Sequence, residues 1–392
     1  MKTSPRSAEA QDVVIVAAAR TPMGKRNGIL SNTHPVDLLA AVQRAVVERA
    51  AVDPLEVEQV IGGCVSAAGE QSYNIVRTAW LAAGFPDSIA GTTVDAQCGS
   101  GQQAVNLAAA LIRSGAVDTA IGCGVESMSR IPIGTATEGP GSPFSARYLE
   151  QYEVISQFEA ADRIARQWHI SRQELDDFGL RSQTKAAEAW QQGIFDEEIV
   201  PIEMLGDRNS GQCAVRDEGL RSSNIERLAE LGPNLPPDGL HTPATSSQIS
   251  DGAAALLLMS ASKARAVGLA PMAFIADQCL IGVHPTLKFT GPIDATRLML
   301  NRTRTVLDDF DVIEVNEAFA SVVLAWEREV KPDMERVNRH GGAIALGHPL
   351  GATGARLLTS ALYDLHRSGG NLALVTMCCG GGLGTATVLE RR

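Results

Sequence analysis

The chain has 392 residues, a formal net charge of −11, a 45% hydrophobic composition and 37 glycines. This length exceeds what one hydrophobic core usually serves, so two or more packed units are expected. The acidic balance argues against a nucleic-acid-binding protein, which normally presents a basic face. No apolar run approaches the roughly 18 residues that a membrane span needs.

The first dozen residues lack the apolar segment of a secretory signal, which predicts a short disordered tail and a cytoplasmic protein. The seven cysteines show no zinc-ligand spacing. We therefore expect reduced thiols, no bound metal and no disulfide framework.

Strands and helices alternate in the first third of the chain. The composition predicts strands at 12–19, 59–65, 92–94 and 118–123, and helices at 38–51, 72–84 and directly after Cys98. The first strand is apolar throughout, as in a strand buried on both faces. This alternation is typical of crossover units in a mostly parallel sheet.

The pattern changes between residues 125 and 250. Residues 130–146 and 232–243 are rich in Gly, Pro, Ser and Thr and predict loops. Ser171 and Glu174 fit a capping box that opens a helix running to Gln192, with Gly193 at its end. Long loops in a compact protein are usually functional, so this segment is interpreted as an inserted loop domain.

After residue 250 the opening pattern returns. Strands are predicted at 253–259, 272–276, 312–315, 372–377 and 385–389, helices at 294–307 and 318–329, and a Gly-rich turn at 341–354. The helix after that turn carries its apolar side chains on one face, namely Leu358, Ala361, Leu362 and Leu365.

The two ends of the chain form an internal repeat. The tripeptide Arg-Ser-Gly ends a helix at 113–115 and again at 367–369, each time shortly before a strand. We predict a duplicated, layered α/β fold with one half at 1–124 plus 251–270, a loop domain at 125–250, and a second half at 271–392. Each half would bury a sheet, and their helices would pack together.

Cys98 lies on the turn between the strand at 92–94 and the helix that follows it. The free N–H groups and the positive end of a helix favour a negative charge. A cysteine placed there can have its thiol pKa lowered and act as a nucleophile. The alternative, a buried structural cysteine, stays open on this stretch alone.

His348 lies in the Gly-rich turn at 341–354, at the place in its half that Cys98 holds in the other. An approximate twofold pairing of the halves predicts that His348 lies beside Cys98, where an imidazole can take the thiol proton. Taken alone, a histidine is more often structural.

Two further stretches of the second half carry polar or reactive groups. Cys378 and Cys379 end a predicted buried strand before a run of glycines whose N–H groups could form an oxyanion hole. Cys378 is the preferred second thiol, and Cys379 is interpreted as packing. Asn316 ends another strand, where an ordinary helix N-cap is the alternative.

Four motifs together resemble the thiolase family. They are Q-C-G-S-G-x-Q-A around Cys98, N-E-A-F-A from Asn316, G-H-P-x-G-x-T-G around His348, and C-x-G-G-G-x-G from Cys378. The similarity runs from Val13 to the C-terminus. It implies a five-layered αβαβα fold of two similar halves, a loop domain that binds coenzyme A, and a homodimer or homotetramer.

The resemblance also implies a role for individual residues. Cys98 would be the acylated nucleophile, activated by His348, and Cys378 the acid/base at the acetyl-CoA enolate. Asn316, through a held water, and His348 would form one oxyanion hole. The N–H groups of Cys98 and Gly380 would form the other.

The resemblance places the substrate in the inserted segment and its surroundings. Ser247 matches the loop that contacts pantetheine, and Arg221 lies in the arginine region near the nucleotide of CoA. Met128, Ala318 and Phe319 are further expected substrate contacts. Short-chain acetoacetyl thiolases have His-Met-Gly in the substrate loop, where this chain has Ser-Gln-Phe at 156–158. The chain resembles in particular the actinobacterial thiolases of sterol side-chain breakdown.

The implied reaction is thiolytic cleavage of a 3-oxoacyl-CoA by CoA, with CoA as a substrate and no cofactor. A biosynthetic acetoacetyl-CoA thiolase is the first alternative. A condensing synthase and a non-catalytic CoA sensor stay open, although Cys378 disfavours the synthase. An NAD(P)-dependent oxidoreductase is a remote alternative, because residues 99–104 match G-x-G-x-x-A after a strand.

Overall fold

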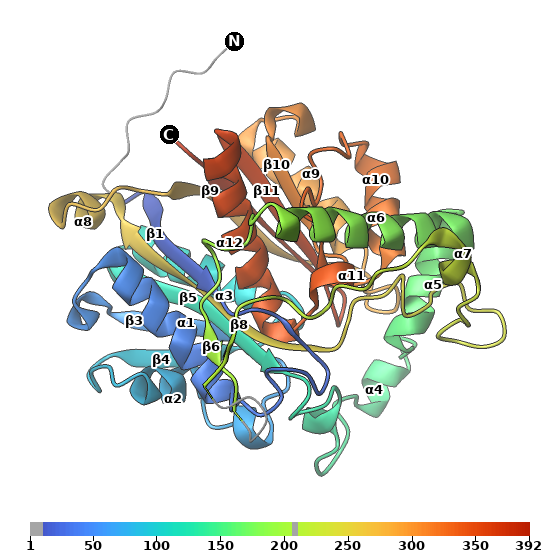
Figure 1. Ribbon diagram of the computed structural model, residues 1–392, viewed down its shortest axis with the longest axis horizontal. Coiled ribbons are helices and arrows are strands. Elements are labelled where there is room, and N and C mark those ends of the chain that lie inside the picture. The colour runs from blue at the N-terminus through green and yellow to red at the C-terminus, as the bar shows by residue number, and fades with distance from the viewer. Residues whose placement is uncertain (1–10, 206–210) are drawn as a thin grey trace.

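The computed structural model describes residues 11–205 and 211–392. Its elements form five layers of helix, sheet, helix, sheet and helix (Figure 1). The expected tail concerns mainly residues 1–10, which lie outside the described residues. Among the residues that the structure describes, no helix is both long and apolar enough to cross a membrane.

The first half supplies one sheet and the helices on both of its faces. Its elements are β1 (Val13–Arg20), β2 (Gly24–Lys25), α1 (Pro35–Ala50), η1 (Pro54–Glu56), β3 (Gln59–Gly63), η2 (Gly69–Gln71), α2 (Ile75–Ala82), β4 (Ala90–Val94), α3 (Ser100–Arg113), β5 (Thr119–Ser127), β8 (Ser250–Ser260) and α8 (Ala261–Ala266). Strands β1, β5 and β8 are buried along their whole length, which explains their apolar sequences.

The second half repeats this plan. It contains β9 (Ala273–Gly282), α9 (Gly291–Thr303), η4 (Leu307–Asp309), β10 (Val312–Val315), α10 (Ala320–Val330), α11 (Ala343–Leu346), α12 (Leu350–Ser368), β11 (Leu372–Cys379) and β12 (Leu383–Glu390). The strand order β10-β11-β12-β9 matches β3-β5-β8-β1 of the first half. The two sheets touch where β1 pairs with β9 over two residues.

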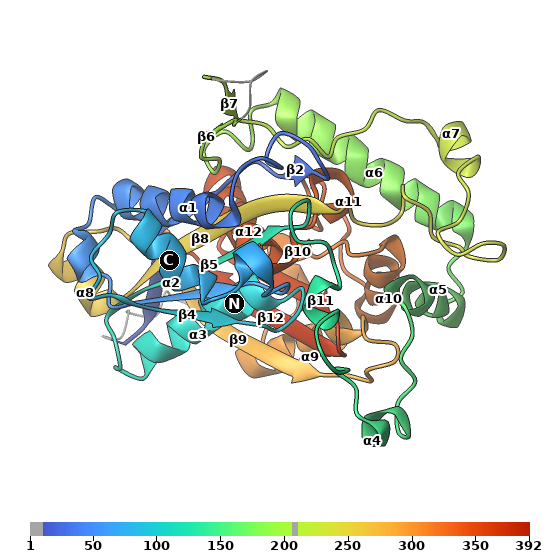
Figure 2. The same cartoon turned by 90° about the horizontal axis from the view of Figure 1, so that it is seen from below.

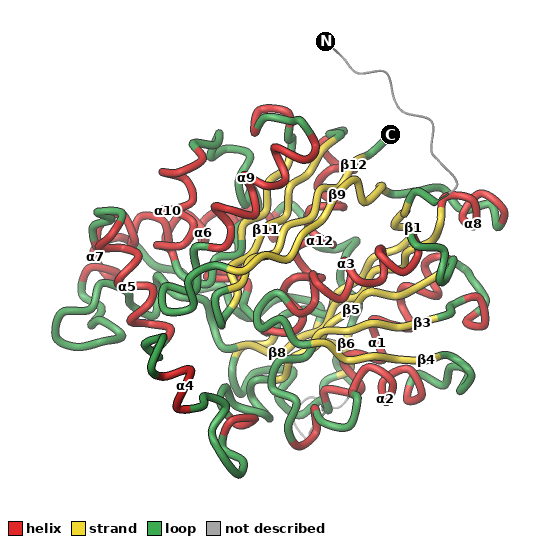
Figure 3. Tube along the Cα trace, turned by 180° about the vertical axis from the view of Figure 1, so that it is seen from behind, coloured by secondary structure: helices red, strands yellow, loops and turns green. Residues whose placement is uncertain are grey.

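Three hydrophobic clusters hold the five layers together. One outer cluster lies between the first sheet and helices α1 and α2. The other outer cluster lies between the second sheet and helices α9 and α10. The middle cluster lies between the sheets and contains the apolar faces of α3 and α12, including Leu358 and Leu362 (Figure 3). The predicted duplicated five-layered fold is therefore confirmed, as is the apolar face of the last helix. The expectation of a mostly parallel sheet is wrong: among the described strands, only β3–β4, β3–β5 and β10–β11 pair in parallel, because β1, β8, β9 and β12 all run antiparallel to their neighbours.

The inserted segment lies beside the two halves. It contains η3 (Thr135–Thr137), α4 (Ala146–Leu149), α5 (Gln157–Gln167), α6 (Arg172–Gln191), β6 (Ile202–Glu203), β7 (Cys213–Ala214) and α7 (Ile225–Ala229). Figure 2 shows α6 along one side of the molecule and α4 projecting from the opposite side. Helix α6 starts with the predicted capping box of Ser171 and Glu174. The proposed domain boundaries stay predictions.

Several element limits differ from the predictions, for local reasons. Helix α1 starts at Pro35, at the first helical position where a missing N–H costs nothing. Phe319 is the N-cap of α10, so that helix begins at Ala320. The predicted turn at 341–354 instead contains α11 and the start of α12. The helices predicted at 72–84 and 294–307 correspond to α2 and α9. Each ends earlier than predicted, at Ala82 and Thr303.

Helix α5 was not predicted at all. Its start does carry a capping signal, because the Ser156 side chain accepts a hydrogen bond from the Glu159 N–H. The resemblance assigns residues 156–158 to a substrate loop, and in the structure they form the N-cap and first turn of α5.

Candidate active site

Cys98 lies on the turn between β4 and α3, as predicted. The residue before it, Gln97, has a left-handed backbone with φ of 54°. Two polar side chains hold this turn. The N–H of Gln97 donates to Asp95 Oδ1 at 2.7 Å, and the N–H of Ala96 donates to Ser100 Oγ at 2.9 Å. The local network thus fixes the backbone that presents the thiol.

The turns that carry Cys98 and His348 can approach each other because α3 and α12 have glycines near their N-terminal ends. A Cβ at Gly101 would lie 2.6 Å from the carbonyl oxygen of Gly351. A Cβ at Gly354 would lie 2.3 Å from the backbone nitrogen of Gln102. Any larger residue at either position would push the two helices apart.

Cys98 and His348 line the same cavity, which opens to solvent. The expected contacts among its lining residues are Met128, Ser247, Ala318 and Phe319, and the others are Ile133, Gln157, Phe158, Ser246, Gln248, Ile249, Phe289 and Leu350. The structure therefore brings six of the ten expected site residues around one space.

His348 is held with one ring nitrogen free. Its Nδ1 lies 2.7 Å from Thr353 Oγ1, and that hydroxyl donates its hydrogen to the carbonyl oxygen of Pro349 at 2.8 Å. With the hydroxyl hydrogen donated to Pro349, the tautomer assigned by this network has the ring proton on Nδ1, which donates it to Thr353. Nε2 is buried and has no hydrogen-bond partner among the described residues. This tautomer leaves Nε2 free to accept a proton.

Burial keeps both reactive groups neutral. It lowers the pKa of His348 to about 3, with a further contribution from the positive charge of Arg356. Burial raises the pKa of the Cys98 thiol to about 11, although the N–H groups of Gly380 and of Cys98 itself oppose this rise. The expected lowering of the Cys98 pKa by the helix end was therefore wrong, because desolvation of the thiolate outweighs it.

Cys378 and Cys379 end β11 and are both fully buried. Burial raises the pKa of each thiol, and a negative charge on Cys98 would raise it further. The two side chains belong to different hydrophobic clusters. Cys378 belongs to the cluster on the outer face of the second sheet, which also contains Ala318 and Phe319, whereas Cys379 belongs to the cluster between the sheets, against which Cys98 packs. Cys378 does not line the cavity itself.

Asn316 lies at the end of β10, next to β11. Its N–H donates to the carbonyl oxygen of Thr376 at 3.1 Å. The side-chain oxygen and nitrogen are both buried, and neither has a hydrogen-bond partner among the described residues. A buried amide without partners is rare and needs an explanation, such as a bound water or ligand atom. The N-cap alternative is excluded, since Phe319 caps α10.

The two residues expected to contact CoA occupy different places. The N–H of Ser247 donates to the carbonyl oxygen of Ala318 at 3.0 Å, which fixes this loop beside the cavity. Arg221 is exposed, and its guanidinium donates to the carbonyl oxygen of Pro243 at 3.1 Å. It does not line the cavity, and its role at the nucleotide stays a prediction.

Several cavity residues were missed from the sequence. Ile133, Phe289 and Leu350 are single apolar residues in or next to loops, where no periodic pattern marks them. Thr353 was visible as the threonine of the motif around His348, but its contact with the imidazole depends on the first turn of α12.

Known proteins with similar sequences cover the whole described fold. The N-terminal domain of thiolases matches residues 13–262 and the C-terminal domain of thiolases matches residues 269–391. A steroid 3-ketoacyl-CoA thiolase of Mycobacterium tuberculosis is 45% identical over 98% of this chain and 96% of its own length. A beta-ketoadipyl-CoA thiolase of Pseudomonas putida is 43% identical over 97% of this chain and 100% of its own length.

A solved structure agrees with these matches. The acetyl-CoA acetyltransferase of Bacillus anthracis superposes with a TM-score of 0.91 at 38% identity, over 98% of this chain and 100% of that one. The two matched domains, the shared fold and the four motifs lead to one conclusion. The chain belongs to the thiolase family.

Proposed function

We propose that this thiolase cleaves 3-oxoacyl-CoA with CoA, through an acyl-enzyme on Cys98, and releases acetyl-CoA or propionyl-CoA and a shortened acyl-CoA. The observation that carries this proposal is the cavity shared by the Cys98 thiol and the unpartnered Nε2 of a neutral His348. Acyl transfer needs a soft nucleophile and a base beside the same carbonyl carbon.

The first half-reaction breaks the bond between C2 and C3. As the Cys98 sulfur attacks the C3 carbonyl, its proton passes to His348 Nε2, and the electron pair of the C2–C3 bond forms the enolate of acetyl-CoA. Cys378 then protonates that enolate. Its raised pKa supports this role, because the thiol keeps its proton until the enolate forms.

In the second half-reaction the CoA sulfur attacks the acyl carbon on Cys98 and its proton passes to the Cys378 thiolate. The bond between the acyl carbon and the Cys98 sulfur breaks, and His348 returns its proton to that sulfur, so the kinetics are ping-pong and reversible. The N–H groups of Cys98 and Gly380 act on the Cys98 sulfur and are candidates for one oxyanion hole. Asn316, through a held water, and His348 are candidates for the other. Each such donor contributes on the order of 10²-fold in rate. These steps use CoA as a substrate and require no cofactor.

The cavity lining favours an apolar acyl group. Met128, Phe158 and Phe289 contribute to it, and none of the described residues that line it is a lysine or arginine. The carboxylate of a 3-oxoadipyl group would find no cation among these residues, only the hydroxyls of Ser246 and Ser247 and the amides of Gln157 and Gln248. This supports the breakdown of lipid or sterol side chains. Biosynthesis of acetoacetyl-CoA, the same chemistry in reverse, is the second candidate.

We also propose a cytoplasmic homodimer or homotetramer. The strand order of the described residues ends at β4, which leaves one backbone edge of that sheet unpaired. Exposed edges of this kind invite pairing with another strand. Sedimentation velocity of the purified protein would measure the number of subunits, and a monomer at micromolar concentration would contradict this part of the proposal.

The test of the reaction follows the acyl group. Mixing with acetoacetyl-CoA is expected to add an acetyl group to Cys98, seen by mass spectrometry of its peptide. His348→Ala should slow this acylation by about 10²- to 10⁴-fold. Cys378→Ala should still accept acetyl from acetyl-CoA but lose C–C bond formation. An adduct on another residue would rule out the proposal, and unaltered condensation would remove Cys378 from the mechanism.

A further inference from the structure

The segment from Gly342 to Gly351 carries His348 and connects the start of α11 to the start of α12. Two buried carboxylates hold it, one near each end. Glu317 comes from the second half, directly after Asn316, and Glu126 comes from β5 of the first half. Their side chains are enclosed, with residue exposures of 1% for Glu317 and 0% for Glu126.

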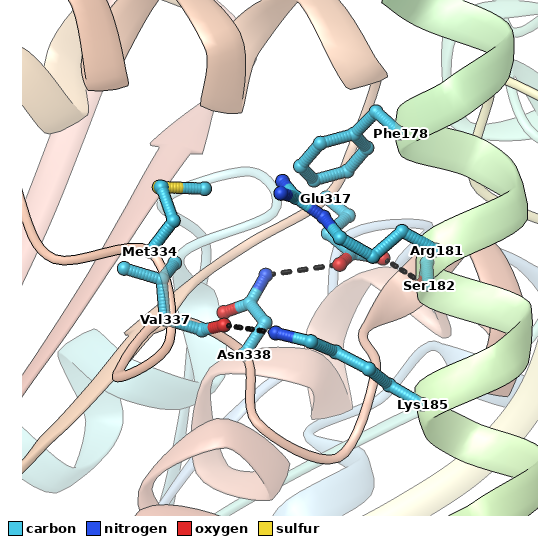
Figure 4. Close-up of a pocket in the computed structure, with 8 residues that line it drawn as sticks. All are labelled: Phe178, Arg181, Ser182, Lys185, Glu317, Met334, Val337 and Asn338. Atoms are coloured by element: carbon cyan, nitrogen blue, oxygen red, sulfur yellow. Dashed lines mark hydrogen bonds between the residues drawn. The ribbon is translucent and has the colours of Figure 1, made fainter.

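Glu317 holds the beginning of the segment, and Figure 4 shows its hydrogen bonds to Ser182 and Asn338. Its Oε2 accepts the N–H of Ile344 at 3.2 Å and the hydroxyl of Ser182 at 2.6 Å. The same hydroxyl oxygen accepts the N–H of Gly342 at 3.2 Å. Oε1 accepts the side-chain amide of Asn338 at 3.0 Å. One carboxylate therefore connects the His348 segment to α6 and to the end of β10.

Glu126 holds the other end of the segment. Its Oε2 accepts the N–H of Gly351 at 2.9 Å and that of Val65 at 3.0 Å. Its Oε1 accepts the N–H of Ser66 at 3.0 Å and the side-chain amide of Gln71 at 2.7 Å. The first turn of α12 is thereby fixed to the first half of the molecule, only three residues after His348.

Both positions require an acceptor at each oxygen. At Glu126 each oxygen accepts two N–H donors, so a glutamine there would place its own NH₂ against two donors in either orientation. At Glu317 the partner Asn338 cannot turn over. Its Oδ1 accepts the N–H of Val315 at 2.8 Å, and its Nδ2 donates to the carbonyl oxygen of Val315 at 2.9 Å. A glutamine at 317 would leave a donor facing a donor.

We infer that Glu126 and Glu317 are positioning residues, which together form a carboxylate clamp that sets where His348 Nε2 lies relative to Cys98. This inference rests on the proposed function of His348 as the base of Cys98. Through the clamp, the first half, the second half and the inserted segment all contribute contacts that hold the segment carrying His348. A shift of about 1 Å in a catalytic group can cost on the order of 10² in rate, so the clamp acts on turnover without touching the substrate.

The clamp is tested in Glu317→Gln and Glu126→Gln of the full-length enzyme. We expect kcat to fall on the order of 10²-fold while the KM for acetoacetyl-CoA changes less than about threefold. Hydrogen–deuterium exchange of the free enzyme should show faster exchange in the peptide covering 342–351, with β8 unchanged. Asp176→Asn is the matched control, because Asp176 is also a buried carboxylate but pairs with Arg172 on α6.

Ser182→Ala is a milder variant for the case that a glutamine variant does not fold. It removes one hydroxyl between Glu317 and Gly342, and we expect a smaller fall in kcat with unchanged KM. The inference is overturned if exchange in 342–351 stays as in the wild type, or if activity falls only in proportion to the folded fraction. Exchange needs no turnover. An inactive wild type would therefore contradict the proposed function, and exchange would still decide whether the carboxylates hold the segment.

Discussion

Cys98 and His348 are neutral at pH 7, and the cause is the environment of each side chain. The rise of the Cys98 pKa to about 11 corresponds to about 3 kcal/mol against the thiolate. A helix N-terminus stabilises a negative charge by about 0.3–1 kcal/mol in ordinary sites and by about 2 kcal/mol in favourable ones. Desolvation therefore dominates, so the resting form is the thiol, and the proposed mechanism moves its proton to His348 as the sulfur attacks.

The protonation state of Cys98 can be measured directly. Because its pKa is raised, the thiol keeps its proton below about pH 11, so the ultraviolet thiolate signal should be absent at pH 7. We expect that signal, taken as wild type minus Cys98→Ala, to grow only as the pH approaches 11. A signal already present at pH 7 would indicate a thiolate–imidazolium pair and contradict the neutral resting state.

At the scale of elements, the site depends on the contact between α3 and α12. Both helices have glycines near their N-terminal ends, although glycine has poor helix propensity. Without side chains, these glycines let the two helix N-termini come close together. Cys98 and His348 stand just before these helices. The catalytic geometry is thus a consequence of helix packing between the two halves.

Gly101→Ala tests this dependence. The added methyl would lie 2.6 Å from the Gly351 oxygen, so the helices must move apart. We expect a loss of about 1–3 kcal/mol in unfolding free energy, the usual cost of overpacking. Activity of the folded enzyme should also fall at least tenfold, since both turns move. Gly139→Ala is the control, because a Cβ there meets no atom within 4 Å. Equal behaviour of both variants would refute the packing argument.

At the scale of the whole molecule, a pair of buried ionisable side chains lies between the middle helix layer and the second sheet. Arg356 on α12 lies 3.8 Å from Glu314 on β10, and both are almost fully buried. Burial raises the pKa of Glu314 to about 8, although Arg356 opposes this. The same Arg356 contributes to the low pKa of His348. With a pKa of about 8, Glu314 is largely protonated at pH 7, so burial of these two groups affects both the pH dependence of stability and the pKa of His348.

Glu314 makes stability depend on pH in a defined direction. Its folded pKa is raised, so its contribution is fully present below the unfolded pKa of about 4.3 and is lost as the pH rises through 8. Denaturant unfolding should show wild type losing on the order of 3 kcal/mol relative to Glu314→Gln between pH 5 and pH 9. Asp294→Asn, an exposed carboxylate on α9, is the control. Parallel stability curves for wild type and Glu314→Gln would contradict a raised pKa.

The sequence by itself determined the repeat, the alternation of strands and helices, and the four motifs. These signals depend on near neighbours along the chain, as the capping box of Ser171 and the apolar face of α12 show. Only the tertiary structure decided the pKa of Cys98, the free nitrogen of His348 and the carboxylates that hold its segment. These properties depend on desolvation and on donors far away in sequence, such as Val65 and Gly351 at Glu126. No local pattern encodes them.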